Sequence, residues 1–86
     1  MFDAAYLARF VGEYNLLGQI ISVTVKGNSL VANIPGQPQW ELLPGLSGDF
    51  TLKQAQVVSL HFVEEQSKVT AVEVRQPGTV LTAKRK

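Results

Sequence analysis

The stretch ISVTVKGNSLVANI, residues 21–34, constrains the fold more than any other part of this chain. Apolar and polar side chains alternate before the sequence KGNS, so Ile21 and Val23 fall on one face of an extended strand. The alternation resumes afterwards with Leu30 and Ala32. The central KGNS supplies residues that tolerate the positive φ angles of tight hairpin turns. The pattern therefore predicts an antiparallel β-hairpin.

Similar short apolar runs recur at intervals of about ten residues, separated by turn sequences such as EQSK and QPG. No stretch is long enough for a helix that connects parallel strands, so the sheet should be antiparallel, with consecutive strands mostly adjacent. This rhythm predicts an all-β sandwich or barrel in one domain over residues 1–86. The eight expected strands lie at 11–17, 21–25, 30–34, 40–43, 50–52, 57–65, 69–75 and 79–84.

Residues 1–10 predict a short helical lead-in before the first strand. Asp3 can accept hydrogen bonds from the free amides of a first helical turn, and Tyr6, Leu7 and Phe10 fall on one side of the helix. The segment lacks a positively charged start followed by an apolar run, so it does not read as a secretory signal. The chain has no cysteine, which fits the cytoplasm and also a periplasmic or secreted location.

The segment IPGQPQWELLP, residues 34–44, surrounds the single tryptophan with prolines and a glycine. Proline cannot donate to a strand ladder, so Pro35 and Pro38 should lie in a connection between two strands. Trp40 follows directly and is expected to pack in the core or at a barrel mouth, because an indole has a large apolar surface. If the barrel binds a ligand, the candidate mouth residues are Pro35, Gln37, Pro38 and Trp40.

The sequence contains no motif that predicts catalysis, a metal site or a cofactor site. His61 alternates with inward-facing neighbours and should point outward, and Glu64 and Glu65 are close in sequence without any marked nucleophile. The serines occur in neither a Ser-x-x-Lys nor a Gly-x-Ser-x-Gly motif, and no glycine-rich phosphate loop is present. We therefore expect a protein that is not an enzyme and that needs no metal or cofactor.

Charge is sparse and uneven. Charged residues form 17% of the chain, against about 25% in typical soluble domains, and between Tyr14 and Gly48 they are only Lys26 and Glu41. Exposed apolar surface is typical of a protein interface. If alternate strand residues fill the interior, an outward apolar stripe on neighbouring strands is expected. Its candidate members are Ile20, Val31, Val57, His61 and Val63.

Two classes of partner are disfavoured. The net charge is +1, and the isolated basic residues alternate with acidic ones, so no nucleic-acid groove is predicted. The apolar runs are far shorter than the roughly 20 residues that a transmembrane helix needs.

Four segments together carry a resemblance to a known family. FVGEYNL at 10–16, LVANIPGQPQWELLP at 30–44, FTLK at 50–53 and FVEEQSKVTAVEVRQPGTVLTAKRK at 62–86 run in order. They resemble the small lipocalin-like domain at the C-terminal end of serine β-lactamase-like hydrolases, of the penicillin-binding and D-aminopeptidase type. Ala71 departs from the family, which usually has glycine there. The catalytic domain has no counterpart in this chain, so the resemblance transfers no catalytic residue.

The resemblance implies an all-β, eight-stranded, antiparallel up-and-down barrel with an accessory role. We expect docking or oligomerisation, with the catalytic domain of such a hydrolase or a second copy of the chain as partner. With strands of five to seven residues, side chains are expected to fill the interior. The side chains expected there are Tyr14, Ile21, Val23, Val25, Leu30, Ala32, Ile34, Trp40, Leu42, Phe50, Leu52, Leu60 and Phe62. The alternative is a lipocalin-like carrier of a small apolar ligand. That alternative predicts a real internal cavity and loss of binding on Trp40→Ala.

Overall fold

A computed structural model describes residues 4–45 and 49–86 of the chain. A short helix precedes eight strands that form one closed barrel. The helix is α1 (Ala4–Ala8), and the strands are β1 (Gly12–Leu16), β2 (Gln19–Lys26), β3 (Ser29–Asn33), β4 (Trp40–Pro44), β5 (Asp49–Leu52), β6 (Ala55–Glu65), β7 (Lys68–Gln76) and β8 (Thr79–Arg85). Asp3, the expected helix cap, lies outside the described residues.

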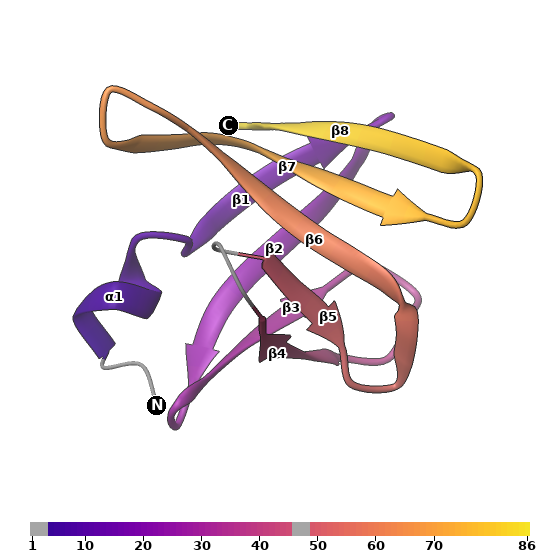
Figure 1. The fold of residues 1–86 in the computed structure, drawn as a ribbon, viewed down its shortest axis with the longest axis horizontal. Coiled ribbons are helices and arrows are strands. Elements are labelled where there is room, and N and C mark those ends of the chain that lie inside the picture. Colours follow the sequence, from indigo (N-terminus) through magenta and orange to yellow (C-terminus); the bar gives the residue numbers. More distant parts are fainter. Residues whose placement is uncertain (1–3, 46–48) are drawn as a thin grey trace.

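Every strand pairs with its sequence neighbour in antiparallel orientation, and β8 returns to pair with β1 (Figure 1). The closing pairs are Tyr14 with Arg85 and Asn15 with Lys84. The predicted all-β antiparallel fold is therefore confirmed, and the barrel rather than the sandwich is the form that it takes. Closure leaves no strand at an open sheet edge, which is how small β proteins avoid pairing with other chains.

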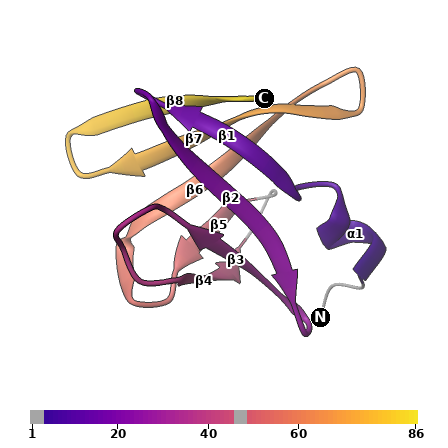
Figure 2. The ribbon, with the colours of Figure 1, turned by 180° about the vertical axis from the view of Figure 1, so that it is seen from behind.

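The strand connections divide between two ends of the barrel. Connections 17–18, 34–39, 53–54 and 77–78 lie at the end away from α1, which we call the mouth (Figure 1). The opposite end, which we call the helix end, holds α1, the turns that follow β2 and β6, and the C-terminus (Figure 2). This division follows from up-and-down topology, because successive connections alternate between the two ends.

Two turns show how the backbone sets the hairpins. The predicted turn between β2 and β3 is confirmed, with Gly27 at a φ of 63°. The first strand ends one residue earlier than predicted, because Leu17 and Gly18 form the next turn with φ angles of 52° and 90°. The Asn15 side chain accepts a hydrogen bond from the Gly18 amide at 2.8 Å. Two successive positive φ angles match the twist of antiparallel strands, although leucine is an unusual residue for this conformation.

Aromatic rings fill the helix end of the barrel. Phe10 follows α1 and lies 5.4 Å from Phe50 and 4.7 Å from Phe62, measured between ring centroids. Tyr14 packs edge-on against Phe62 at 5.8 Å and donates its hydroxyl to the Phe10 carbonyl at 2.7 Å. Leu7, on α1, is also buried. The helix therefore closes this end, which agrees with the apolar side predicted for the lead-in.

The inward residues match the predicted alternation along the strands. Nine of the side chains expected in the interior are buried: Tyr14, Ile21, Val23, Leu30, Ala32, Leu42, Phe50, Leu60 and Phe62. Those expected inward but only partly buried are Val25, Ile34, Trp40 and Leu52. The last two strands add further buried residues that the sequence reading did not assign: Val69, Val72, Val74 and Ala83.

Two irregularities interrupt the ladders of β6. Between β6 and β7, the pairs Val63 with Ala71 and Glu64 with Val69 leave Thr70 as an extra residue on β7. Ala71, the position at which the resemblance would lead one to expect glycine, therefore borders a β-bulge and lies on the outer wall, where its neighbours leave 8% of its surface accessible. Between β5 and β6, Thr51 pairs with Ser59 while the next residue pairs with Ala55, so residues 56–58 have no partner on β5.

Candidate functional site

The mouth opens into a cavity of about 270 Å³ inside the barrel. Its walls come from every strand except β8, and most of its side chains are apolar. The lining residues are Leu16, Gln19, Ile21, Ala32, Ile34, Gln37, Trp40, Leu52, Ala55, Val58, Leu60, Val74 and Gln76. The expectation that side chains fill the interior is therefore correct at the helix end and wrong at the mouth. The wall includes Ala32 and Ala55, whose methyl groups leave room where larger residues would meet.

The connection between β3 and β4, residues 34–39, forms one side of this mouth, and we call it the elbow. The Gln37 amide donates to the Ile34 carbonyl at 3.0 Å, and Gly36 has a φ of 80°. Proline followed by a glycine with positive φ is the sequence signature of a type II turn, so Pro35 and Gly36 fix the path of the chain. The indole nitrogen of Trp40 donates to the Gln37 side-chain oxygen at 3.4 Å. The predicted strand connection is confirmed, and it carries two side chains to the cavity.

The four predicted mouth residues separate into two pairs. Gln37 and Trp40 line the cavity, and Trp40 is half-buried against the core. Pro35 instead borders a groove on the outer wall, together with Ile20 and other residues of β2. Pro38 is exposed and lines neither hollow. The elbow thus presents polar and aromatic side chains to the cavity, whereas its prolines shape the backbone.

The predicted apolar stripe does not form, which corrects the sequence reading. Ile20 lies on β2 and Val31 on β3, whereas Val57, His61 and Val63 lie on β6. Strands β4 and β5 separate these two groups in the barrel, so the five residues are not on neighbouring strands. Alternation along each strand gave the outward direction but could not give the distance around the barrel wall.

Val31 is also buried rather than exposed, with 4% of its surface accessible. Polar side chains cover it on the outer wall, where it lies beside Gln39, Glu41 and Gln54. The Gln54 amide group spans the neighbouring chain by donating to the Gln39 carbonyl at 3.4 Å and accepting from the Glu41 amide at 3.3 Å. A valine on the outer wall therefore needs no partner protein to keep it from water.

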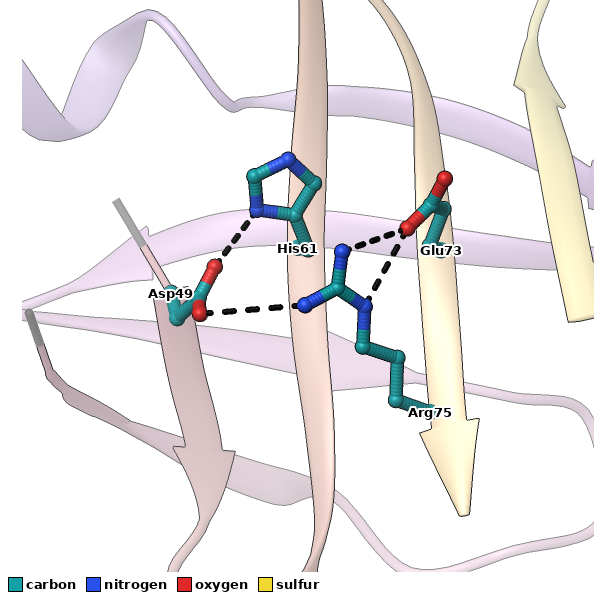
Figure 3. A network of polar contacts seen from close by, with 4 residues as sticks. All are labelled: Asp49, His61, Glu73 and Arg75. Carbon is teal, nitrogen blue, oxygen red and sulfur yellow. Dashed lines mark hydrogen bonds and ion pairs between the residues drawn. The ribbon is translucent and has the colours of Figure 1, made fainter. Parts of the chain in front are cut away.

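His61 belongs to a polar network on the outer wall, formed by β5, β6 and β7 (Figure 3). Its Nδ1 atom lies 2.5 Å from Asp49 Oδ1, and Arg75 Nη1 lies 4.0 Å from the other oxygen of Asp49. Arg75 also donates to Glu73 Oε1 through Nε at 3.1 Å and Nη2 at 2.8 Å. The outward direction predicted for His61 is confirmed, whereas its carboxylate partner is Asp49 rather than Glu64 or Glu65.

This network has the form of a surface ion-pair cluster. Its histidine and Asp49 side chains are 34% and 37% exposed, so solvent screens the charges. Within the described residues, no hydroxyl or amine nucleophile is bonded to the second ring nitrogen of His61. The arrangement fixes the outer faces of three strands relative to one another, and the cavity lies on the other side of the wall.

The charged groups concentrate away from the mouth. Among the four mouth connections only Lys53 carries a charge, and its Nζ atom lies 3.8 Å from Glu41 Oε1. At the helix end, Arg9 forms an ion pair with Glu64, and the Lys86 Nζ atom lies 3.6 Å from Glu13 Oε1. The uneven charge of the sequence thus becomes an end with few charges and an end with many charges of one barrel.

Burial raises the pKa of the Tyr14 hydroxyl above its ordinary value, and the Arg85 cation partly opposes this effect. The guanidinium carbon of Arg85 lies 6.0 Å from the Tyr14 ring centroid. Sequence reasoning placed Tyr14 in the interior but gave Arg85 no role. The final AKR segment was the available signal, because it belongs to the family resemblance, yet nothing in the spacing showed which strand it would meet.

No protein-family model and no curated protein matches this sequence. Among residues 4–45 and 49–86, no helix combines the length and the apolar character needed to cross a membrane. The same described residues contain no group of three or more histidine, cysteine or acidic side chains that could hold a metal ion. The lipocalin-like family therefore stays a prediction.

Proposed function

We propose that this chain binds a small apolar molecule in the cavity at the mouth of the barrel. The observation that carries the proposal is the apolar hollow of about 270 Å³ beside the half-buried Trp40. Binding sites for small molecules are concave and mostly apolar, with a few polar groups that orient the ligand, and the mouths of β-barrels are a common place for them. Gln19, Gln37 and Gln76 supply such polar groups here.

The energetics of a small domain support this proposal. A chain of 86 residues has a small core, so apolar walls without packing partners reduce a modest stability. A single substitution of Ala32 by a larger apolar residue would fill part of this space. A cavity kept open at the mouth of such a small barrel is consistent with selection for a ligand rather than for stability.

Toluene is a suitable first probe, because it has no polar head group and about seven non-hydrogen atoms, fewer than the cavity can hold. Titration followed by NMR should shift the resonances of Trp40, Leu60 and Val74, and it should change the fluorescence of the single tryptophan. Shifts that are confined to the outer wall, or no saturable shift at all, would refute the proposal.

Two variants and one matched control localise the binding. Ala32→Leu should fill the cavity and abolish the toluene shifts while the protein stays folded, because the added atoms extend into existing space. Thr24→Leu, on the exposed outer wall of the adjacent strand, adds the same kind of apolar surface and should leave binding unchanged. Trp40→Ala should also abolish binding, and retained binding in a folded Trp40→Ala protein would exclude the mouth as the site.

A docking role for the same end of the barrel is the second candidate. The large apolar side chains most exposed in the described residues are Leu17 (85%), Val57 (72%) and Val80 (58%), and all three lie near the mouth. Leu17 keeps a left-handed backbone that favours asparagine or glycine, so its presence there suggests selection for an apolar tip.

The partner that we propose for this apolar patch of Leu17, Val57 and Val80 is a second copy of the chain, since the one charged residue of the mouth connections, Lys53, is already paired with Glu41. Sedimentation velocity over a range of concentrations should show reversible dimers. Leu17→Asn and Val57→Thr should weaken them, whereas Thr82→Ser on the exposed wall of β8 should not. A monomer at all concentrations would exclude self-association through this apolar patch.

A further inference from the structure

The chemistry of the cavity lining limits the class of ligand, and this inference rests on the binding function proposed above. None of the lining residues carries a charge, and their hydrogen-bonding side chains are the carboxamides of three glutamines and the indole of Trp40. Carboxamides both donate and accept hydrogen bonds without net charge. The polar part of a bound molecule would therefore meet neutral donors and acceptors at the rim.

The volume limits the size of the ligand. An apolar protein cavity of about 150 Å³ holds benzene, so a cavity of about 270 Å³ has room for about ten non-hydrogen atoms. Molecules of this size bind with dissociation constants of about 10 μM to 1 mM, because each atom contributes a limited free energy. The cavity is too small for a long-chain fatty acid or a sterol.

Two cationic side chains that are adjacent in sequence or connection to the mouth do not line the cavity. Arg75 precedes the lining residue Gln76, but it points to the outer wall and donates to Glu73. Lys53, in the connection between β5 and β6, lies beside Glu41. Neither side chain lines the cavity, so a carboxylate at the exposed glutamine rim would lose part of its hydration without gaining a counter-charge. Loss of hydration by an unpaired carboxylate is unfavourable.

We infer that the ligand class is an uncharged amphiphile of about ten non-hydrogen atoms, with a compact hydrocarbon part and a neutral head that donates and accepts hydrogen bonds. Primary amides and alcohols have this chemistry, whereas fatty acids and alkylamines do not. The hydrocarbon part lies against Ile21, Leu60 and Val74. The head group lies at the rim, where Gln37 already accepts a hydrogen bond from Trp40 and retains its NH₂ group as a donor.

Octanamide and octanoate test this inference, because both contain about ten non-hydrogen atoms and differ mainly in charge at about pH 8. We expect octanamide to bind with a dissociation constant at least about tenfold lower than that of octanoate. NMR shifts at Leu60 and Trp40 report the affinity, and Ala32→Leu should remove them. Equal affinities, or tighter binding of octanoate, would overturn the ligand class while the binding function stands.

A charge introduced at the rim provides a matched test of where the head group lies. Gln76→Arg should tighten octanoate binding by about tenfold, because it supplies the missing counter-charge at the rim. Thr82→Arg adds the same charge on the outer wall and should change octanoate affinity by less than about twofold. If both variants behave alike, the head group does not lie at the rim. If toluene and octanamide both fail to bind, the proposed function itself is wrong.

Discussion

Arg85 of the last strand lies directly against Gly12 of the first strand, so that a methyl group at position 12 would be 2.8 Å from the Arg85 Nε atom. From this position the guanidinium donates to the Val69 carbonyl at 3.0 Å and to the Val11 carbonyl at 2.6 Å. One side chain therefore links strands β7 and β8 to the segment that enters β1. Glycine at position 12 provides the space that this contact requires.

Gly12→Ala should lower the free energy of unfolding by about 1–2 kcal/mol, because the displaced guanidinium leaves two carbonyl groups without their donor. The backbone at position 12 does not have a positive φ, so alanine itself is compatible with the strand. Urea unfolding followed by Trp40 fluorescence measures the change.

The Arg85→Ala background provides the control for this prediction. Without the guanidinium, a methyl group at position 12 meets no obstacle, so Gly12→Ala should there cost much less. The same cost in both backgrounds would show that the contact with Arg85 is not the reason for glycine.

Leu17→Asn should raise the free energy of unfolding by about 0.5–1 kcal/mol. Asparagine adopts the left-handed backbone more readily than leucine, and Asn-Gly is the preferred pair for this type of turn. The Leu17 side chain is 85% exposed, so its removal sacrifices little packing. Thermal or urea unfolding measures the effect, with Val80→Asn as a control that removes exposed apolar surface where φ is ordinary. A loss of stability in Leu17→Asn would mean that the leucine makes contacts that matter.

The stability of the barrel should fall as the pH rises above about 10, the ordinary pKa of tyrosine. Burial raises the pKa of Tyr14 in the folded state, so the folded protein holds this proton more tightly than the unfolded chain. The contribution is fully present below the unfolded pKa and is lost as the pH rises through the folded pKa. Urea midpoints at several pH values measure the slope.

Tyr14→Phe separates this effect from other alkaline titrations. The variant loses the hydrogen bond to the Phe10 carbonyl and should be less stable near neutral pH. Above about pH 10, however, its stability should decline less steeply than that of the wild type. Parallel declines in the two proteins would exclude Tyr14 as the group responsible.

Leu42→Ala should destabilise the protein more than Leu60→Ala, although both leucines are buried. Leu42 does not line the cavity, so we expect a cost of about 3–5 kcal/mol for the new void. Leu60 already faces the cavity on one side and has fewer packing partners to lose, so a cost of about 2 kcal/mol is expected. Urea unfolding of the two variants compares them directly, and a reversed order would mean that the cavity is filled in solution.

The strands and several turns could be predicted from the sequence, because the alternation of apolar and polar residues is a local property. The hairpin that contains Val23 and Leu30 was correctly predicted, and so was the strand connection at Pro35. The turn at Leu17 was missed, since leucine carries no turn signal and the cause lies in Gly18 and the register of β1 with β2.

The candidate site depended on information that is not local. Gln37 and Trp40 were placed near a mouth, but the cavity is lined by residues from seven strands, with Ala32 and Ala55 among them, and no linear pattern reveals that these residues meet around one space. The expected stripe failed for a similar reason, since two strands separate Val31 from His61. Val31 points outward but is covered by polar neighbours. This covering depends on which strands pair in the folded barrel, and no local pattern predicts it.

The closure of the barrel between β1 and β8 has a consequence for biosynthesis. Arg85 and Val11, which meet at this seam, are 74 positions apart in the chain. A ribosome must therefore release almost the whole of this segment before the first strand finds its last partner. Until then the inward faces of β1 and β2 stay open to solvent and to other chains. Folding of this barrel accordingly follows synthesis of its last strand, and its rate should depend on how quickly the two distant strands meet.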